Sequence, residues 1–478
     1  MRQGNALPFV AALAVLSAAA MLHAQCTPTV VTVSQPGTFP NHVAGPIATN
    51  GTFIAVAKND LTTTTPAIYF GRYDANLNPA GTDQKIVTTS LNGATALFYA
   101  DDANEYGLFY QRADAQLLLQ RIDANGNAIS TPIAMPHSWS PNDEFDVTWD
   151  HAAGNYVLAH LVTGGPDLGL WLEMISPAGK IISDLNVSPF ASRGSNNTRV
   201  TALPDGSVAV SWTSSTQATF VTIVRSSSML PIEITEQAVT STRIASNGIS
   251  VMAIYSAPRT GGGTQMRFTV INASTGATTT PDALYLNARG ADIAPLSLQW
   301  VPATSEFLLV YADSIAGFNL FPGEVHLRRF AAPGAPSSDT FLSPNANLNL
   351  LNAPYPLLFV NGGYIGSISR FVSIAQGGES YLVRVCPLLT SFTADHAVSR
   401  SFSPITFRAT ASGGSPGYSY SWQFGDNASA NGAVVQHMYS ANGTYTVTLT
   451  AMDAAGATAI YKSTVLITDQ VRSRAARH

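Results

Sequence analysis

Short runs of apolar and β-branched residues follow one another along the chain, each broken by Gly, Pro, Asn or Asp. Between about residues 45 and 386 these runs include TFIAVAK from Thr52, NYVLAHLV from Asn155, VAVSW from Val208 and FLLVYA from Phe307. The runs have the length and composition of strands, and no long segment shows the 3.6-residue apolar period of a helix. The pattern therefore predicts an all-β region.

A second pattern, a strand followed by a turn and another short strand, recurs through the same region. Its seven anchor positions are spaced by 47 to 59 residues: Tyr73, Ile122, Ile175, Val224, Ile271, Phe330 and Val385. A period near 50 with four short strands per unit is typical of a β-propeller blade. We therefore expect residues 26–386 to form a propeller of seven blades, with six or eight as alternatives.

The first unit illustrates the four strands expected in each blade. They are predicted at Pro46–Ala48, Thr52–Lys58, Ala67–Tyr73 and Gln84–Thr89. In the second unit, the sequence Asp-Ala-Asn-Gly at 123–126 is a hairpin signal, which predicts that the third strand pairs with the fourth.

The two ends of the repeat region suggest how the ring closes. An outer strand follows each of the first six anchors, whereas Val385 leads directly into Cys386. We expect Val30–Ser34 to supply the missing strand, since a closed ring leaves no edge exposed there. The chain has two cysteines, and a Cys26–Cys386 disulfide beside this strand would stabilise the fold by about 4 to 5 kcal/mol in the chain-entropy model. The alternative is that both cysteines are unpaired.

The N-terminus has the order of a secretory signal peptide. Arg2 precedes an apolar run from Phe9 to Leu22, which is too short to span a bilayer, and we expect cleavage after Ala24. A lipoprotein anchor at Cys26 is the weaker alternative because Gln25 precedes it. No later apolar stretch is long enough to cross a membrane. We therefore expect residues 1–24 to be removed and the protein to be secreted or associated with the cell surface, without stable membrane insertion.

Charge excludes one class of partner. Only 11% of the residues are charged, with 24 basic and 29 acidic side chains. This composition produces no positive field that would attract nucleic acid. A short basic tail at 471–478 is predicted to be disordered.

The last part of the chain has a different pattern, and it resembles the PKD family. The motif runs from Phe407 to Ala459 and ends in a strand with the sequence Gly-Thr-Tyr-x-Val-x-Leu. The positions that match the family pattern most directly are Trp422, Phe424, Gly425, Asp426, His437, Tyr439, Gly443, Tyr445 and Asp453. The resemblance implies that residues 388–470 form an immunoglobulin-like β-sandwich of a kind common outside cells.

The residues of this module support a sandwich on physical grounds. From Tyr445 to Ala451 every second residue is apolar, so one face of the strand packs and the other meets water. Trp422 and Phe424 also alternate, and we expect them to supply the core of the opposing sheet. Asn427 follows Gly-Asp at a position where the family usually has glycine, and Asn tolerates a left-handed backbone. Asp426 and His437 are interpreted as structural, with an acid/base pair or a calcium ligand as alternatives.

No motif that would identify a reaction appears in the context that it requires. This holds for nucleophile elbows, zinc spacings, phosphate-binding loops and calcium loops. A glycan-cleaving propeller would need two carboxylates facing one pocket. The candidates, each following an apolar strand, are Asp60, Asp101, Asp102 and Asp313. Equivalent repeat positions would place them on one face of the ring, but loop residues without a shared site are the plainer interpretation.

Histidine and tryptophan add no clear site. The histidines His42, His137, His151, His160 and His326 show no ligand spacing. The tryptophans Trp139, Trp149, Trp171, Trp212 and Trp300 are interpreted as packing residues between blades, with a sugar platform as the alternative for some.

These observations favour a secreted, non-catalytic binding or adhesion protein. The propeller would present a face to an extracellular glycan or protein ligand, and the C-terminal module would act as a spacer or contact domain. The alternative is a secreted carbohydrate-active or other hydrolase with a catalytic propeller. We expect no cofactor, no metal ion and a monomeric protein.

Overall fold

The computed structural model describes most of the chain. The described residues are 29–33, 42–60, 66–88, 91–137, 140, 143–192, 197–225, 228–236, 239–288, 292–302, 304–314, 323–330, 338–341, 357–360, 363–373, 377–386, 388–414, 416–454 and 458–469. The predicted leader, Cys26 and the tail at 471–478 lie outside them. Strands dominate the described residues, which confirms the all-β prediction.

The repeat region forms seven sheets in the described residues, and consecutive strands of a sheet pair antiparallel. The first sheet contains β2 (His42–Thr49), β3 (Ile54–Asp60), β4 (Ala67–Tyr73) and β5 (Gln84–Thr88). The second contains β6 (Leu91–Ala100), β7 (Glu105–Arg112), β8 (Leu117–Asp123) and β9 (Ile133–Ala134), with the short 3₁₀ helix η1 (Asp101–Ala103) between β6 and β7. The third contains β10 (Glu144–Asp150), β11 (Asn155–Val162), β12 (Gly169–Ile175) and β13 (Ile181–Ser188).

The remaining four sheets follow the same plan. In the fourth, β14 (Ala191–Ser192) and β15 (Arg199–Ala202) both pair with β16 (Val208–Ser214), followed by β17 (Thr219–Arg225) and β18 (Ser228–Thr235). The fifth contains β19 (Ser241–Ser246), β20 (Ser250–Pro258), β21 (Thr264–Asn272) and β22 (Thr278–Asn287). The sixth contains β23 (Asp292–Val301), β24 (Glu306–Ser314), β25 (Gly323–Phe330) and β26 (Ser338–Phe341). The seventh contains β27 (Leu358–Val360), β28 (Gly363–Ser373), β29 (Gly377–Val385) and β1 (Thr29–Thr32).

The sequence repeat corresponds to these sheets. Every anchor lies at or next to the last residue of the third strand of its sheet, from Tyr73 in β4 to Val385 in β29. The predicted hairpin at 123–126 is also present, because Gly126 donates its N–H to the Asp123 carbonyl with a positive φ of 95°. The period of about 50 residues therefore does mark one four-stranded unit.

Apolar side chains fill the spaces between neighbouring sheets. Seven separate cores join the first sheet to the second and so on around the ring, and the last of them joins the seventh sheet back to the first. In the first of these cores Tyr106 is fully buried, with its ring 5.2 Å from Phe70. A ring of sheets closed by packing in this way is a β-propeller.

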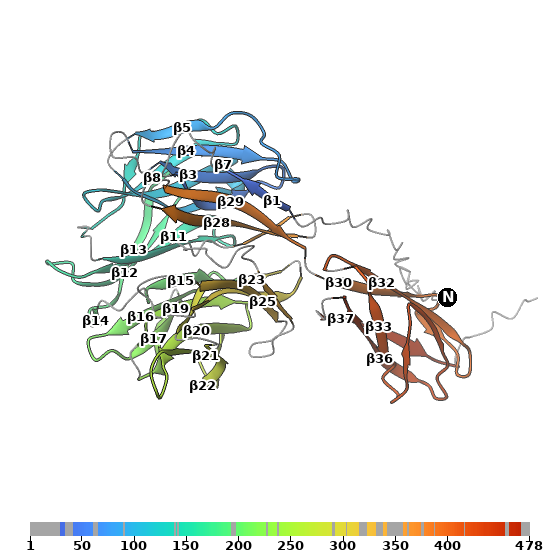
Figure 1. The fold of residues 1–478 in the computed structure, drawn as a ribbon. Helices are drawn as coiled ribbons and strands as arrows, with labels where there is room; N and C mark the ends of the chain where they lie inside the picture. Colours follow the sequence, from blue (N-terminus) through green and yellow to red (C-terminus); the bar gives the residue numbers. More distant parts are fainter. Residues whose placement is uncertain are drawn as a thin grey trace, which may run out of the picture.

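The N-terminal strand closes the ring. β1 pairs antiparallel with β29, with Thr29 opposite Arg384 and Thr32 opposite Tyr381. It therefore forms the outer strand of the seventh sheet, as expected, although it spans Thr29–Thr32 rather than Val30–Ser34. In Figure 1 the orange strands β28 and β29 lie beside the blue strands of the chain's beginning.

The predicted disulfide joins one described residue, Cys386, to one that lies outside the described residues, Cys26. Cys386 is buried directly after β29, and the described residues contain no free cysteine. Its predicted partner Cys26 lies outside the described residues, so the pairing stays a prediction.

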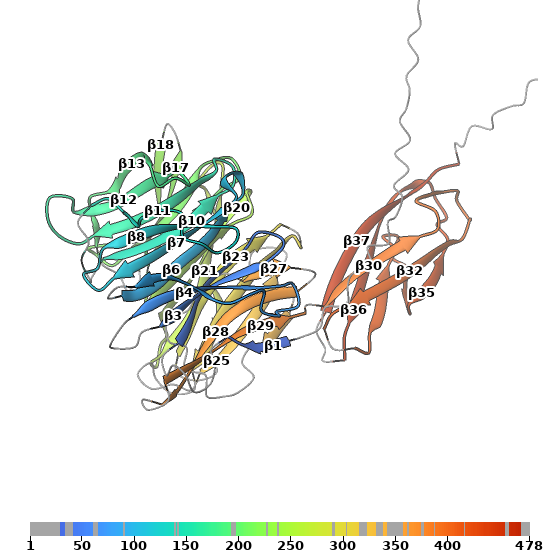
Figure 2. The ribbon, with the colours of Figure 1, turned by 90° about the horizontal axis from the view of Figure 1, so that it is seen from above.

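The C-terminal sheets form a second body, drawn in orange to red (Figure 2). One sheet contains β30 (Leu389–Ala394), β32 (Ile405–Ser412) and β35 (Val434–His437). The other contains β31 (Val398–Ser399), β37 (Thr458–Ile467), β36 (Gly443–Met452), β33 (Ser419–Gln423) and β34 (Ser429–Asn431). The two sheets enclose one apolar core, so the predicted β-sandwich is confirmed.

One detail of the sandwich prediction was wrong. Trp422 does not belong to the sheet opposite β36, because β33 pairs with β36 and places Trp422 directly opposite Leu449. Side chains that are paired across two strands point to the same face, so both enter the core from one sheet. The opposing sheet contributes Ile405, Phe407 and Val435 instead. The alternation in β36 is as expected, with Val447 and Leu449 fully buried.

The packing between the first and seventh sheets predicts the cost of weakening the closure. Leu382 in β29 is fully buried in the core that joins these sheets. Leu382→Ala is expected to destabilise the protein by about 2–5 kcal/mol, because a cavity remains where the side chain packed. Urea unfolding of the mature chain measures this loss. The control, Leu284→Ala, alters an exposed leucine and should leave the midpoint nearly unchanged; equal effects of the two variants would contradict the described packing.

Candidate functional site

The four predicted carboxylates do not share one end of the ring. Asp60 is the last residue of β3 and Asp313 lies near the end of β24, so both are at the end of a second strand. Asp101 and Asp102 lie in η1, at the turn between a first and a second strand. Antiparallel strands place these two turns at opposite ends of a sheet. The structure therefore corrects the expectation of a common face and defines an Asp60 end and an Asp101 end of the ring.

The surroundings of these carboxylates also differ. Asp60 and Asp313 are buried, with 3% and 4% of their surface exposed, whereas Asp101 and Asp102 are exposed. Asp101 Oδ2 lies 3.9 Å from Nδ1 of the exposed His151. In this pairing, solvent screens most of the attraction.

Charged side chains of the innermost strands connect neighbouring blades. Glu144 in β10 accepts hydrogen bonds from the backbone N–H groups of Asn197 and Thr198, each at 3.1 Å. Asp146 accepts one hydrogen bond from the Val200 N–H at 2.9 Å. The pKa of Asp146 is raised, because the effect of burial exceeds the opposing effect of nearby Arg199. These carboxylates are therefore engaged in holding the third sheet against the fourth.

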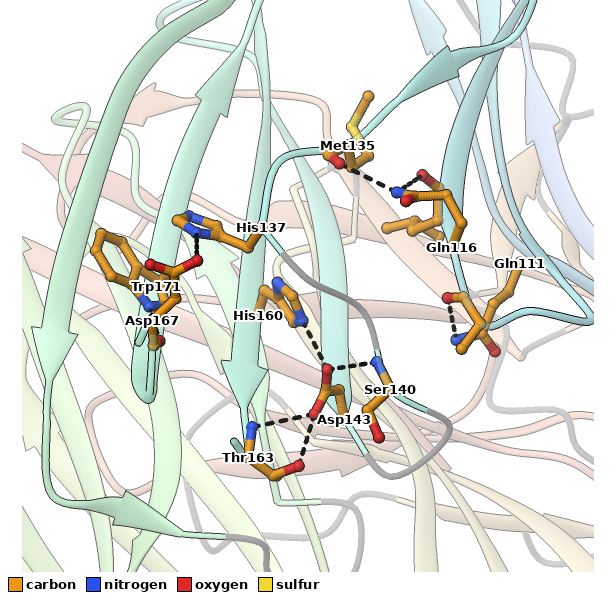
Figure 3. A network of polar contacts seen from close by, with 12 residues as sticks. Gln111, Gln116, Met135, His137, Ser140, Asp143, His160, Thr163, Asp167 and Trp171 are labelled. Atoms are coloured by element: carbon orange, nitrogen blue, oxygen red, sulfur yellow. Dashed lines mark hydrogen bonds and ion pairs between the residues drawn. The ribbon is translucent and has the colours of Figure 1, made fainter. Parts of the chain in front are cut away.

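A denser polar cluster lies at the Asp60 end of the third sheet, and Figure 3 shows its His137 and Asp167 side chains beside Trp171. His137, in the connection between β9 and β10, has its Nε2 atom 3.2 Å from Asp184 Oδ1 and 3.5 Å from Glu173 Oε1. Its Nδ1 atom lies 3.6 Å from Asp167 Oδ2, and its ring lies 4.3 Å from the half-buried indole of Trp171. We call His137, Glu173, Asp184 and Asp167 the His137 cluster.

Glu173 is the member of the His137 cluster that is fully buried and has no hydrogen-bond partner. Its side chain has no exposed surface, and neither carboxyl oxygen has a hydrogen-bond partner. Burial raises the pKa of Glu173 well above its ordinary value, and Asp184 raises it further. The two acids are directly opposite each other on β12 and β13, an arrangement that destabilises a sheet when both carry charge.

A neighbouring pair has a structural role. The buried carboxylate of Asp143 accepts hydrogen bonds from the Thr163 hydroxyl at 2.8 Å and the Ser140 backbone at 2.8 Å, and His160 lies 3.5 Å away (Figure 3). Burial alone would raise the pKa of Asp143, but these contacts lower it below its ordinary value. Burial also lowers the pKa of His160. The pair thus ties the β9–β10 connection to β11.

The backbone leading to His137 is held in place as well. The Met135 N–H donates to the Leu117 carbonyl at 3.0 Å, and the Gln116 side chain donates to the Met135 carbonyl at 3.1 Å. His137 itself has a positive φ of 67°, a region that non-glycine residues occupy only when their surroundings impose it. The backbone at His137 is therefore fixed by its surroundings, and the imidazole packs beside Trp171.

Sequence reasoning missed the His137 cluster because its members are far apart along the chain. The available signal was local, since Glu173 interrupts the apolar strand GLWLEMI and His160 interrupts NYVLAHLV. A charged residue in a buried strand is uncommon without a partner.

The interpretation of the tryptophans as packing residues agrees with the structure for Trp149 and Trp212, which are buried in cores between sheets. Trp300 is partly buried in another such core, and Trp139 lies outside the described residues.

In the C-terminal domain, Asp426 and His437 contact each other. His437 Nε2 lies 2.8 Å from Asp426 Oδ2, and the imidazole stacks on Phe424 with ring centroids 4.1 Å apart. Asp426 also accepts the Ala428 N–H at 3.1 Å, which stabilises a turn with positive φ at Gly425 and Asn427. Every contact here is internal to the domain, in agreement with a structural role.

The outer face of the same domain has a groove of about 490 Å³. Most of its lining is neutral and polar, including Ser421, Gln423, Asn431 and Thr448, and Lys462 is its one charged residue. Such a surface can hydrogen-bond a polar ligand but has no carboxylate for acid or base chemistry.

Comparisons with known proteins agree with the two-part architecture. Residues 386–468 match the family model described as "PKD domain", and the C-terminal sandwich is a PKD domain. No curated protein matches the chain. Among the described residues, no helix has the length and apolar character that a membrane crossing requires.

Several solved propeller structures resemble the chain at low identity. The β-propeller domain of the Trilobed protease from Pyrococcus furiosus is 6% identical, with a TM-score of 0.45, covering 73% of this chain and 94% of that one. A chain of the Mitotic Checkpoint Complex is 14% identical (TM-score 0.45; 76% and 92% covered), and SapL1 lectin in complex with alpha methyl fucoside is 10% identical (TM-score 0.39; 63% and 95% covered). The order of the sheets and the apolar cores between them define the ring independently of these likenesses.

The Asp426–His437 contact predicts a pH-dependent contribution to stability. The pKa of Asp426 is lowered, since burial raises it but the contacts with His437 and Ala428 outweigh that effect. A lowered pKa in the folded state adds stability above the ordinary aspartate value of about 3.9, and this stability is lost as the pH falls through the folded value. Asp426→Asn should therefore cost about 1 kcal/mol at pH 7 and less at about pH 2.

Hydrogen exchange of peptides from β33 to β36 in a urea series measures this difference at both pH values. Asp114→Asn, an exposed residue of the ring, is the control and should not change exchange in this domain. A cost of Asp426→Asn that is the same at both pH values would contradict the role of the charge.

Proposed function

We propose that this chain is a secreted, non-catalytic binding protein. Its propeller binds a ligand on the face at the Asp60 end of the ring. The PKD domain acts as a spacer or as a second contact surface. The observation that carries the proposal is the distribution of the predicted carboxylates: Asp101 and Asp102 lie at the opposite end of the ring from Asp60 and Asp313, so the four do not share one site. Glycosidases need two such groups about 5 to 10 Å apart.

Other charged groups near the ring centre support the same conclusion. Glu144, Asp146 and Asp143 accept hydrogen bonds from neighbouring backbone groups and are engaged in structure. The groove on the PKD domain has no carboxylate in its lining. PKD domains occur in extracellular proteins, which fits a ligand outside the cell.

The Asp60 end has the surface character of a ligand site. The half-buried indole of Trp171 lies there beside Asp167 and the exposed Leu168, so apolar and polar surface meet. Sites for glycans and for protein side chains combine an aromatic surface with a few positioned polar groups. We propose an extracellular glycan or protein as the ligand class.

A secreted hydrolase is the second candidate. The observation that favours it is Glu173, a buried carboxyl with a raised pKa beside His137 and Asp184. Perturbed acids of this kind are common at catalytic centres, although they also occur in structural clusters. Full burial of Glu173 argues against direct contact with a large substrate.

The binding proposal is tested with the mature chain on arrays of extracellular glycans and proteins, beside a hydrolysis screen on polysaccharides and peptides. We expect saturable binding without turnover. Trp171→Ala should weaken that binding by about 2- to 10-fold, since a stacked aromatic contact contributes about 0.5–1.5 kcal/mol. His151→Ala, at the Asp101 end, is the control and should bind like the wild type.

Turnover of any array ligand that is abolished by Glu173→Gln would overturn the binding proposal and support the hydrolase. Binding that His151→Ala abolishes and Trp171→Ala spares would place the ligand at the Asp101 end instead.

Export and the disulfide are tested together on protein recovered from the culture medium. We expect the mature N-terminus at Gln25 and a nonreduced peptide pair that contains Cys26 and Cys386. Peptide mapping by mass spectrometry identifies both. Retention of residues 1–24, or two free thiols in the folded protein, would contradict the corresponding prediction.

A further inference from the structure

We propose that the His137 cluster binds one divalent transition-metal ion of the Zn²⁺ type, with His137, Glu173 and Asp184 as ligands. The sequence predicts no metal ion, because these three residues are brought together only by the fold. The inference does not depend on the proposed ligand-binding function, since metal binding is measured without that ligand.

The geometry of the three side chains fits a small cation. Their candidate ligand atoms all lie within 4.8 Å of one another. The distances from His137 Nε2 are 3.2 Å to Asp184 Oδ1 and 3.5 Å to Glu173 Oε1. In a tetrahedral zinc site with bonds of about 2.0–2.1 Å, ligand atoms are separated by roughly 3.3 Å. The two distances from His137 already match this separation, and atoms at the 4.8 Å limit would need to approach by about 1.5 Å.

The electrostatic balance of the cluster points to a cation. Three carboxyl groups, those of Asp167, Glu173 and Asp184, surround one imidazole. No lysine or arginine in the described residues forms an ion pair with any of the three. A protonated His137 could offset one negative charge only, whereas a divalent ion offsets two.

Glu173 provides an independent observation. It is completely buried, both of its oxygens lack hydrogen-bond partners, and it is directed toward His137 Nε2. A buried carboxyl without a partner is costly to a fold unless it coordinates a metal or is paired. Its position opposite Asp184 on the neighbouring strand adds a repulsion that coordination would remove.

The imidazole ligand and its contact with Asp167 favour an ion of the zinc type. Asp167 Oδ2 lies 3.6 Å from His137 Nδ1, on the side of the ring away from the proposed ion. A carboxylate in this place orients a metal-binding histidine and makes it a stronger ligand. Calcium and magnesium take oxygen ligands, so an imidazole nitrogen favours zinc and similar ions.

Isothermal titration of the metal-stripped, untagged mature chain with Zn²⁺ tests the proposal, and Ca²⁺ serves as the comparison ion. We expect one Zn²⁺ per chain and far weaker binding of Ca²⁺. His137→Ala should abolish this binding, and Glu173→Gln should weaken it at least tenfold. Asp167→Asn should weaken it about 10- to 100-fold. His151→Ala, an exposed histidine outside the cluster, is the control and should leave it unchanged.

Glu173→Gln keeps the size of the side chain and removes an unpaired buried acid, so this variant should fold, which circular dichroism checks. Because the Trp171 indole lies beside His137, with ring centroids 4.3 Å apart, a change in fluorescence on Zn²⁺ addition that is lost in Trp171→Phe locates the ion at the cluster. The proposal is overturned if the wild-type chain binds no Zn²⁺, or if His137→Ala and Glu173→Gln bind it as the wild type does.

Discussion

The pairing of β1 with β29 is the interaction on which the rest of the ring depends. It joins residues 29–32 to residues 381–384, so nearly the whole repeat region lies between the two partners. The core beneath this pair contains Ile54 and Val56 from the first sheet and Ile365 and Leu382 from the seventh. Every other sheet is held between two neighbours by similar apolar packing, and this closure gives the end sheets the same two-sided support.

Closure of the ring also explains where buried charged side chains are found. The blades pack through alternating apolar positions, so a charged side chain at such a position must find partners at a seam between sheets. Glu144 and Asp146 find them in the backbone of the next blade. Glu173 finds no hydrogen-bond partner and instead faces His137, which reaches the third sheet from the connection after β9. The His137 cluster is thus a product of the seam, and neither blade contains it alone.

Much of the fold could be predicted from the sequence because its signals are local and repeated. The anchors at about 50-residue spacing mark the third strands, and the missing outer strand after Val385 indicated that the N-terminus closes the ring. The PKD motif identified the C-terminal sandwich. The assignment of Trp422 to the opposing sheet failed because alternation shows which face of a strand is buried and does not show which strand is its neighbour. The expectation of a common face failed because the strand before Asp101 is the first strand of its sheet, whereas Asp60 ends a second strand.

The site was harder to predict than the fold because its residues come from separate elements. His137 lies on the connection between two sheets, whereas Glu173 on β12 and Asp184 on β13 are brought together by strand pairing within the third sheet. Both the proposed ligand face and the proposed metal site therefore require an intact ring. Hydrogen exchange of the β1 amides in the mature native protein tests closure most directly. We expect the amides of Thr29–Thr32 to be protected as strongly as those of their partners in β29. Exchange of Thr29–Thr32 at the rate of an unstructured chain, with β29 still protected, would contradict closure by the N-terminal strand.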